Sequence, residues 1–130
     1  MKVDGRSPPR SQARPVAMNI LVVEDNLDLQ LTVCELIGML GHAASGAVDA
    51  EQAWELMRAR HVDILLTDVN LPGMSGIALA RMARRVQPAI RIIFSTGYDM
   101  HMLERLDFSV NILPKPYDMP ALQAALEPRA

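Results

Sequence analysis

Short apolar runs recur along this chain, and each pair is separated by enough residues for a helix. Three of the runs are rich in β-branched residues and almost continuously apolar, as strands buried on both faces of a parallel sheet are: residues 19–23, 62–67 and 90–94. Two further segments, at 42–45 and 110–113, have a weaker apolar pattern and are predicted as weaker strands. Because parallel neighbours need a long crossover connection, the pattern predicts parallel strands joined by helices.

The segments between these runs have helical spacing. Asp49 followed by Gln52 resembles a capping box that opens a helix ending at Arg60. One face of the first helix is apolar, at Leu29, Val33, Leu36, Ile37 and Leu40. Further helices are expected at about 75–86 before Pro88, at 100–106, and after Asp118 with Pro120 in the first turn. Strand and helix alternating five times predict an α/β fold, a doubly wound five-stranded parallel sheet flanked by helices.

The ends of the chain set the expected domain limits. Residues 1–17 hold three prolines, four basic groups and one acid with no apolar period, so we expect a disordered tail, followed by one domain over 18–127. The tail has no apolar stretch of a secretory signal and no segment approaches 18 apolar residues, which predicts a cytoplasmic protein without membrane contact. The remaining chain is acidic, with nine Lys and Arg against fourteen Asp and Glu, which disfavours nucleic-acid binding.

Polar residues follow the strands of the predicted sheet. Doubly wound sheets bind ligands at the carboxyl ends of their strands, near the switch in strand order. The residues expected at that edge are Glu24, Asp25, Asp68, Ser95, Thr96, Gly97 and Lys115. Three close carboxylates repel one another, so the arrangement calls for a divalent cation. Mg²⁺ suits oxygen ligands, whereas Zn²⁺ favours His or Cys.

Other candidate groups carry less weight. His42, His61 and His101 are scattered, and we interpret them as surface or boundary residues. Cys34 stands alone in an apolar helix, so it is expected to pack rather than react. Lysine usage is more informative, because eleven arginines accompany only two lysines, and Lys115 is the only one after the tail. A compact ammonium between two prolines suits a phosphoryl oxygen.

Four motifs resemble those of the receiver domain of two-component response regulators, which has a flavodoxin-like fold. They are "VVEDN", "LLTDVNLPGMSG", "FSTG" and "LPKPY", and the resemblance covers about residues 18–126. Their order and their separations, 43 residues from Asp25 to Asp68, 28 to Thr96 and 19 to Lys115, make coincidence improbable. "FSTG" partly resembles a branch of the family with Phe-Ala-Thr-Gly at this place.

The resemblance implies a role for each residue. Asp68 would accept a phosphoryl group from a sensor histidine kinase or a histidine phosphotransfer protein. Mg²⁺ would be held by Asp25, Glu24, Asp68 and the backbone carbonyl of Asn70. The phosphoryl group would contact the Thr96 hydroxyl, the Lys115 ammonium and the backbone amides of Gly97 and Val69, with the Lys115–Pro116 bond cis. We expect Thr96 rather than Ser95 to supply this hydroxyl. Side chains alternate along a strand, so the Ser95 side chain is expected to face a helix.

The sequence also departs from the family. Ile112 stands where many receivers have an aromatic residue that turns inward with the switch threonine, so Tyr98 becomes the candidate for carrying the signal outward. A phosphatase of the aspartyl-phosphate type would need an aspartate where Asn70 stands, so we expect a signalling switch that catalyses its own phosphorylation and slow dephosphorylation, not a turnover enzyme. The alternative is a degenerate receiver that binds proteins independently of phosphorylation. The sequence does not identify the downstream protein target. It also leaves open whether the domain forms a homodimer, and whether it is a stand-alone regulator or a domain excised from a larger protein.

Overall fold

The computed structural model describes residues 17–97 and 110–128. The helix expected at 100–106 and the signalling role expected of Tyr98 therefore lie outside the described residues. Within them, the strands are β1 (Asn19–Val23), β2 (Ala43–Ala47), β3 (Ile64–Asp68), β4 (Arg91–Thr96) and β5 (Asn111–Pro114). The helices are α1 (Leu27–Met39), α2 (Ala50–Ala59), α3 (Gly76–Val86) and α4 (Met119–Leu126).

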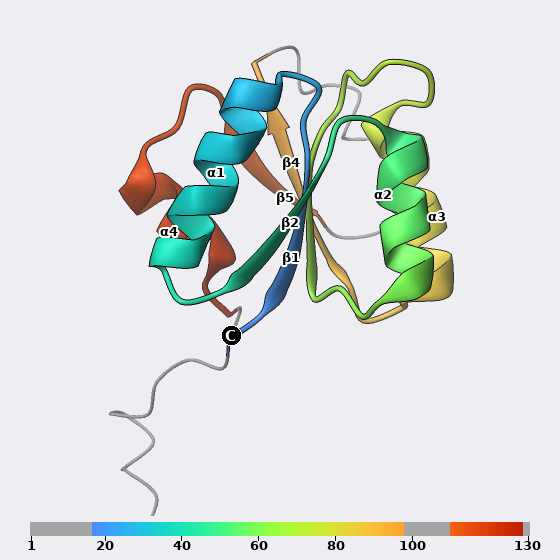
Figure 1. Ribbon diagram of the computed structural model, residues 1–130, viewed down its shortest axis with the longest axis horizontal. Helices are drawn as coiled ribbons and strands as arrows, with labels where there is room; N and C mark the ends of the chain where they lie inside the picture. Colours follow the sequence, from blue (N-terminus) through green and yellow to red (C-terminus); the bar gives the residue numbers. More distant parts are fainter. Residues whose placement is uncertain (1–16, 98–109, 129–130) are drawn as a thin grey trace, which may run out of the picture.

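The strands form one parallel sheet in the order β2-β1-β3-β4-β5. Figure 1 shows α1 and α4 on one face of the sheet and α2 and α3 on the other. The chain winds from β1 outward to β2 and then returns past β1 to β3, so the strand order reverses between β1 and β3. The predicted doubly wound fold is confirmed. Ligands of such sheets bind at the point where the strand order reverses, which here lies between β1 and β3.

The core has two parts because the sheet is covered on both faces. Successive strand residues point to opposite sides, so Leu65 packs with α2 and α3 while Leu66 packs with α1 and α4. In β4, Phe94 belongs to the cluster under α2 and α3, and Ile93 belongs to the cluster under α1 and α4. This two-sided burial explains why the strands are continuously apolar in sequence.

Side-chain caps begin the helices. Asp49 accepts a hydrogen bond from Gln52 N–H, and the Gln52 side chain accepts one from Val48 N–H, which confirms the predicted start of α2. Asp118 caps α4, as expected from its place before Pro120. The sequence reading did not assign the caps of α1 and α3, Asn26 and Ser75.

Four of the five strands have boundaries that differ by one or two residues from those predicted, and two of these shifts have a visible cause. β3 begins at Ile64 rather than Val62, because the Val62 N–H donates to the Gln87 side chain instead of to a neighbouring strand. β4 continues past Phe94 to Thr96, because Ser95 pairs with Asp68 and Thr96 with Pro114 in the parallel register. The hydroxyl residues therefore belong to the sheet itself and are buried.

Gly76 joins α3 to the segment after β3. Its N–H donates to the Val69 carbonyl at 2.8 Å, and a Cβ at this position would collide with the Asp68 carbonyl oxygen. We expect Gly76→Ala to lower the free energy of unfolding by about 2 kcal/mol, because backbone must move to admit the methyl group. Gly38→Ala in α1 is the control: nothing lies within 4 Å of its added Cβ, so higher helix propensity should leave stability equal or higher. Urea unfolding measures both, and an unaffected Gly76→Ala would contradict this packing.

Asp63 connects the starts of β1 and β3. Its carboxylate accepts the Asn19 N–H at 2.7 Å and contacts His61 Nε2 at 2.8 Å. The Asn19 hydrogen bond lowers the pKa of Asp63 below its ordinary value of 3.8, with burial opposing and His61 adding to the effect. A lowered pKa stabilises the fold above the unfolded value, and this contribution disappears as the pH falls through the folded value.

We therefore expect Asp63→Ala to lower stability by about 1 kcal/mol at neutral pH. The difference between the variant and the wild type should shrink as the pH falls below 3.8. Urea unfolding of both proteins across this range tests the sign, and a difference that grows in acid would contradict it.

Candidate functional site

Three carboxylates meet at the carboxyl ends of β1 and β3. One oxygen each from Glu24, Asp25 and Asp68 lies within 4.8 Å of the others. Glu24 is buried, Asp68 is partly buried and Asp25 is exposed. β1 and β3 are neighbours in the sheet, so residues separated by more than forty positions reach one edge. The acidic edge expected from the sequence is present in the fold.

Lys115 lies between two of these carboxylates. Its Nζ donates to Glu24 Oε1 at 2.6 Å and to Asp68 Oδ2 at 3.0 Å. Burial by itself lowers the pKa of Lys115. The hydrogen bonds and the negative charges of Glu24 and Asp68 together raise the pKa by more than this, so the net pKa lies above the ordinary value. The sequence reading assigned Lys115 to a phosphoryl oxygen. In this structure it is the counter-ion of the cluster.

Backbone amides fix the other oxygen of each paired carboxylate. Asn26 N–H donates to Glu24 Oε2 and Asn70 N–H donates to Asp68 Oδ1, both at 3.1 Å. Each of the two carboxylates thus has one oxygen on a backbone N–H and one on the Lys115 ammonium. Such charge-assisted bonds hold the groups in defined orientations before any ligand arrives.

The sequence reading missed one supporting side chain. Gln30 is buried in α1, and its Nε2 donates to the Glu24 carbonyl at 3.2 Å. Gly46 in β2 leaves the space that Gln30 occupies, since a Cβ there would collide with the glutamine side chain. The available signal was a polar residue next to the apolar face of α1.

The hydroxyl side of the site is formed by the end of β4. Thr96 is buried, and its carbonyl accepts the Lys115 N–H at 3.0 Å, which joins β4 to the turn after β5. Gly97 follows as an exposed residue, and Val69 is buried directly after Asp68. The Lys115–Pro116 peptide is cis, as the resemblance implied.

The donor set of the acidic cluster fits a hard divalent cation. Carboxylate oxygens, with the Asn70 backbone beside them, are ligands that Mg²⁺ accepts, and no histidine or cysteine from the described residues belongs to the cluster.

The described histidines and the cysteine lie away from this cluster. His42 Nδ1 accepts the Met18 N–H and His61 pairs with Asp63, while His101 lies outside the described residues. Burial raises the pKa of the Cys34 thiol, as expected for a packing residue.

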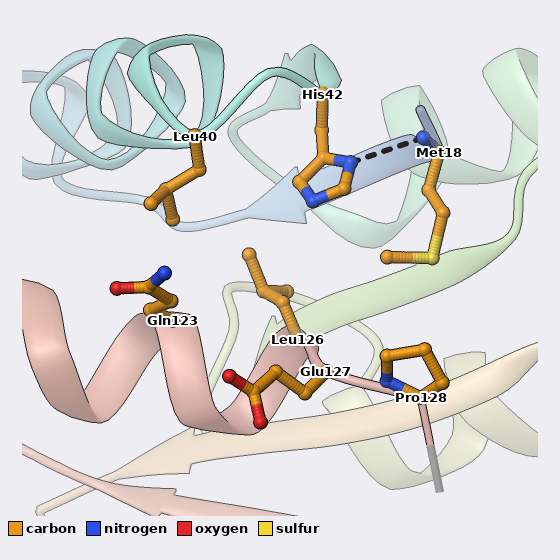
Figure 2. A pocket seen from close by; sticks show the side chains of 7 residues that line it. All are labelled: Met18, Leu40, His42, Gln123, Leu126, Glu127 and Pro128. Carbon is orange, nitrogen blue, oxygen red and sulfur yellow. Dashed lines mark hydrogen bonds between the residues drawn. The ribbon is translucent and has the colours of Figure 1, made fainter. Parts of the chain in front are cut away.

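A hollow of about 290 Å³ lies elsewhere, against the start of β1 and the ends of α1 and α4. Figure 2 shows the hollow and the hydrogen bond from Met18 N–H to His42. The mainly apolar lining consists of Met18, Leu40, His42, Gln123, Leu126, Glu127 and Pro128. None of these residues belongs to the acidic cluster, which lies at the other ends of the strands. Among the helices described, none has the length and apolarity needed to cross a membrane.

The fold and the acidic edge define a doubly wound α/β domain with a carboxylate cluster at the carboxyl ends of its strands. Residues 20–127 match the response regulator receiver domain family, and the chain belongs to that family. The receiver protein CpdR of Brucella abortus is 32% identical over 79 residues, covering 61% of this chain and 66% of CpdR. Sporulation initiation phosphotransferase F of Bacillus subtilis is 25% identical over 111 residues, covering 83% of this chain and 90% of that protein.

Several solved structures are similar in both fold and sequence, and one of them is of particular interest. It is a response regulator from Burkholderia pseudomallei, described with a phosphorylated aspartic acid, a calcium ion and citrate. Its TM-score is 0.74 at 28% identity, over 85% of this chain and 66% of that one. The predicted family and fold are therefore confirmed.

The cluster should bind Mg²⁺ through its charge. Asp25→Asn and Asp68→Asn should each weaken Mg²⁺ binding by about tenfold or more, because each removes one negative charge from the ligand set. Isothermal titration of Mg²⁺ into each variant measures the change. Glu55→Gln, an exposed change on α2, is the charge-matched control and should bind as wild type. Unchanged affinity in both aspartate variants would remove the cluster as a cation site.

Proposed function

We propose that this protein is the phosphoacceptor of a two-component phosphorelay and that Asp68 is the residue modified. The observation that carries the proposal is the Asp68 carboxylate itself, fixed by Asn70 N–H and Lys115 Nζ beside Glu24 and Asp25. The donor would be the phosphohistidine of a sensor kinase or of a phosphotransfer protein. Phosphorylation would change which protein partner the domain binds.

The transfer balances with the groups present. An Asp68 carboxylate oxygen attacks the phosphorus, a P–O bond forms, and the P–N bond to the donor histidine breaks, with its electron pair returning to the imidazole. Mg²⁺ held by Glu24, Asp25, Asp68 and the Asn70 carbonyl would supply charge neutralisation for this step. Lys115 is already at the Asp68 oxygen and can follow the negative charge onto the phosphoryl group.

The phosphoryl group would be held by residues at the ends of β3 and β4. The Thr96 hydroxyl and the backbone amides of Val69 and Gly97 are the proposed donors. Two relatives support phosphorylation of an aspartate in this family, one by its name as a phosphotransferase and the other by its description with a phosphorylated aspartic acid and a calcium ion.

The proposal extends to the character of the protein. We propose a cytoplasmic switch whose domain comprises residues 18–127 and which catalyses its own phosphorylation and slow dephosphorylation. Asn70 stands where an aspartyl-phosphate hydrolase would need a second aspartate, which supports slow loss of phosphate rather than turnover.

Phosphorylation can be tested directly. Incubation with Mg²⁺ and acetyl phosphate, followed by intact-mass spectrometry, should add one phosphoryl mass to the wild type and none to Asp68→Asn. Asp63→Asn is the matched control, because it changes an aspartate at the opposite end of β3 and should still be modified. If the wild type binds Mg²⁺ but stays unmodified, the phosphorylation-independent binding module becomes the better description.

A further inference from the structure

The Ser95 hydroxyl is buried and makes no hydrogen bond within the part of the chain that the structure describes. The residue is 4% exposed, and its Oγ has no hydrogen-bond partner among the described residues. Buried polar groups in folded proteins are nearly always paired, so an exception calls for an explanation. Ser95 is in register with Asp68 across the β3–β4 ladder, which places the unpaired hydroxyl beside the proposed phosphoacceptor.

Tyr117 brings a second hydroxyl to the same place. Its partly buried ring packs against the cluster between the sheet and the α1/α4 layer, which also contains Ile93 and Leu113. Ser95 faces this layer as well, since it follows Ile93 by two strand positions and is in register with Leu113. The Ser95 hydroxyl is one of the groups that act on the Tyr117 phenol, which places the two side chains close together, but no hydrogen bond is formed to Ser95 Oγ among the described residues.

Tyr117 is also within the electrostatic reach of the site. Burial raises the pKa of its phenol, and the Ser95 hydroxyl acts in the opposite direction. The charges of Lys115, Glu24 and Asp68 act on it with mixed sign, and the net pKa lies above the ordinary value of 10. The phenol therefore keeps its proton at neutral pH and can donate a hydrogen bond.

We propose that Tyr117 is a positioning residue for the phosphorylated form, in which its hydroxyl bonds to Ser95 and holds the Lys115 turn against β4. This inference rests on the proposed function. Phosphorylation of Asp68 replaces a carboxylate partner of Lys115 with a phosphoryl oxygen, and Tyr117 is only two residues farther along the same turn. Closing the Ser95–Tyr117 bond at that step gives the unpaired hydroxyl its partner, so the pair favours the phosphorylated arrangement.

The test compares the binding of beryllofluoride, a mimic of the aspartyl phosphate, in the presence of Mg²⁺. Tyr117→Phe and Ser95→Ala should each weaken beryllofluoride binding about fivefold, the size of one net hydrogen bond. The double variant should be no weaker than either single variant, because both remove the same bond. Mg²⁺ affinity without beryllofluoride should be unchanged in all three. Ser45→Ala, which removes a hydroxyl from β2, is the matched control and should bind as wild type.

The outcomes separate the two proposals. Urea unfolding of the unliganded variants shows whether they are folded, and a merely structural role would lower that stability without a selective loss of beryllofluoride affinity. If Tyr117→Phe binds beryllofluoride as wild type, or if the single effects add in the double variant, the inference is overturned. If the wild type is not phosphorylated by acetyl phosphate, the proposed function fails instead and this inference fails with it.

Discussion

The ion pairs of Lys115 decide how the carboxyl edge of the sheet can exist. Two carboxylates, one buried and one partly buried, share a single ammonium at 2.6 and 3.0 Å. Without that cation, close carboxylates in a poorly solvated place would repel one another. Removing one member of such a group leaves uncompensated charge. The turn that carries Lys115 is also held by a backbone hydrogen bond to the Thr96 carbonyl, which fixes the place of the cation.

The parallel sheet is what brings these charges together. Every strand ends at the same edge, so residues that follow β1, β3, β4 and β5 become neighbours although 91 positions separate Glu24 from Lys115. The same topology keeps the apolar hollow at the start of β1 away from the acidic cluster. Function in this fold is therefore concentrated on connections, while the strands supply rigidity.

Pattern reasoning reached the fold because the pattern has one physical solution. Continuous β-branched runs separated by amphipathic segments can be buried only between two helical layers. It was less accurate at element ends, where side chains compete with the ladder: Gln87 takes the Val62 N–H, so β3 starts later than its apolar run. It also missed Gln30, because a glutamine beside an apolar helix face gives no local indication that a glycine on β2 leaves room for it.

The sequence by itself determined the five strands, the caps at Asp49 and Asp118, the family, and the residues that reach the acidic edge, since these depend on local composition and on the order of motifs. Only the tertiary structure decided which oxygen faces which donor, that Lys115 serves as an internal counter-ion, and that the buried Ser95 hydroxyl lies in register with Asp68 without a hydrogen-bond partner among the described residues. Those relations depend on strand register and on packing between distant segments, where a shift of one residue would turn each side chain to the opposite face.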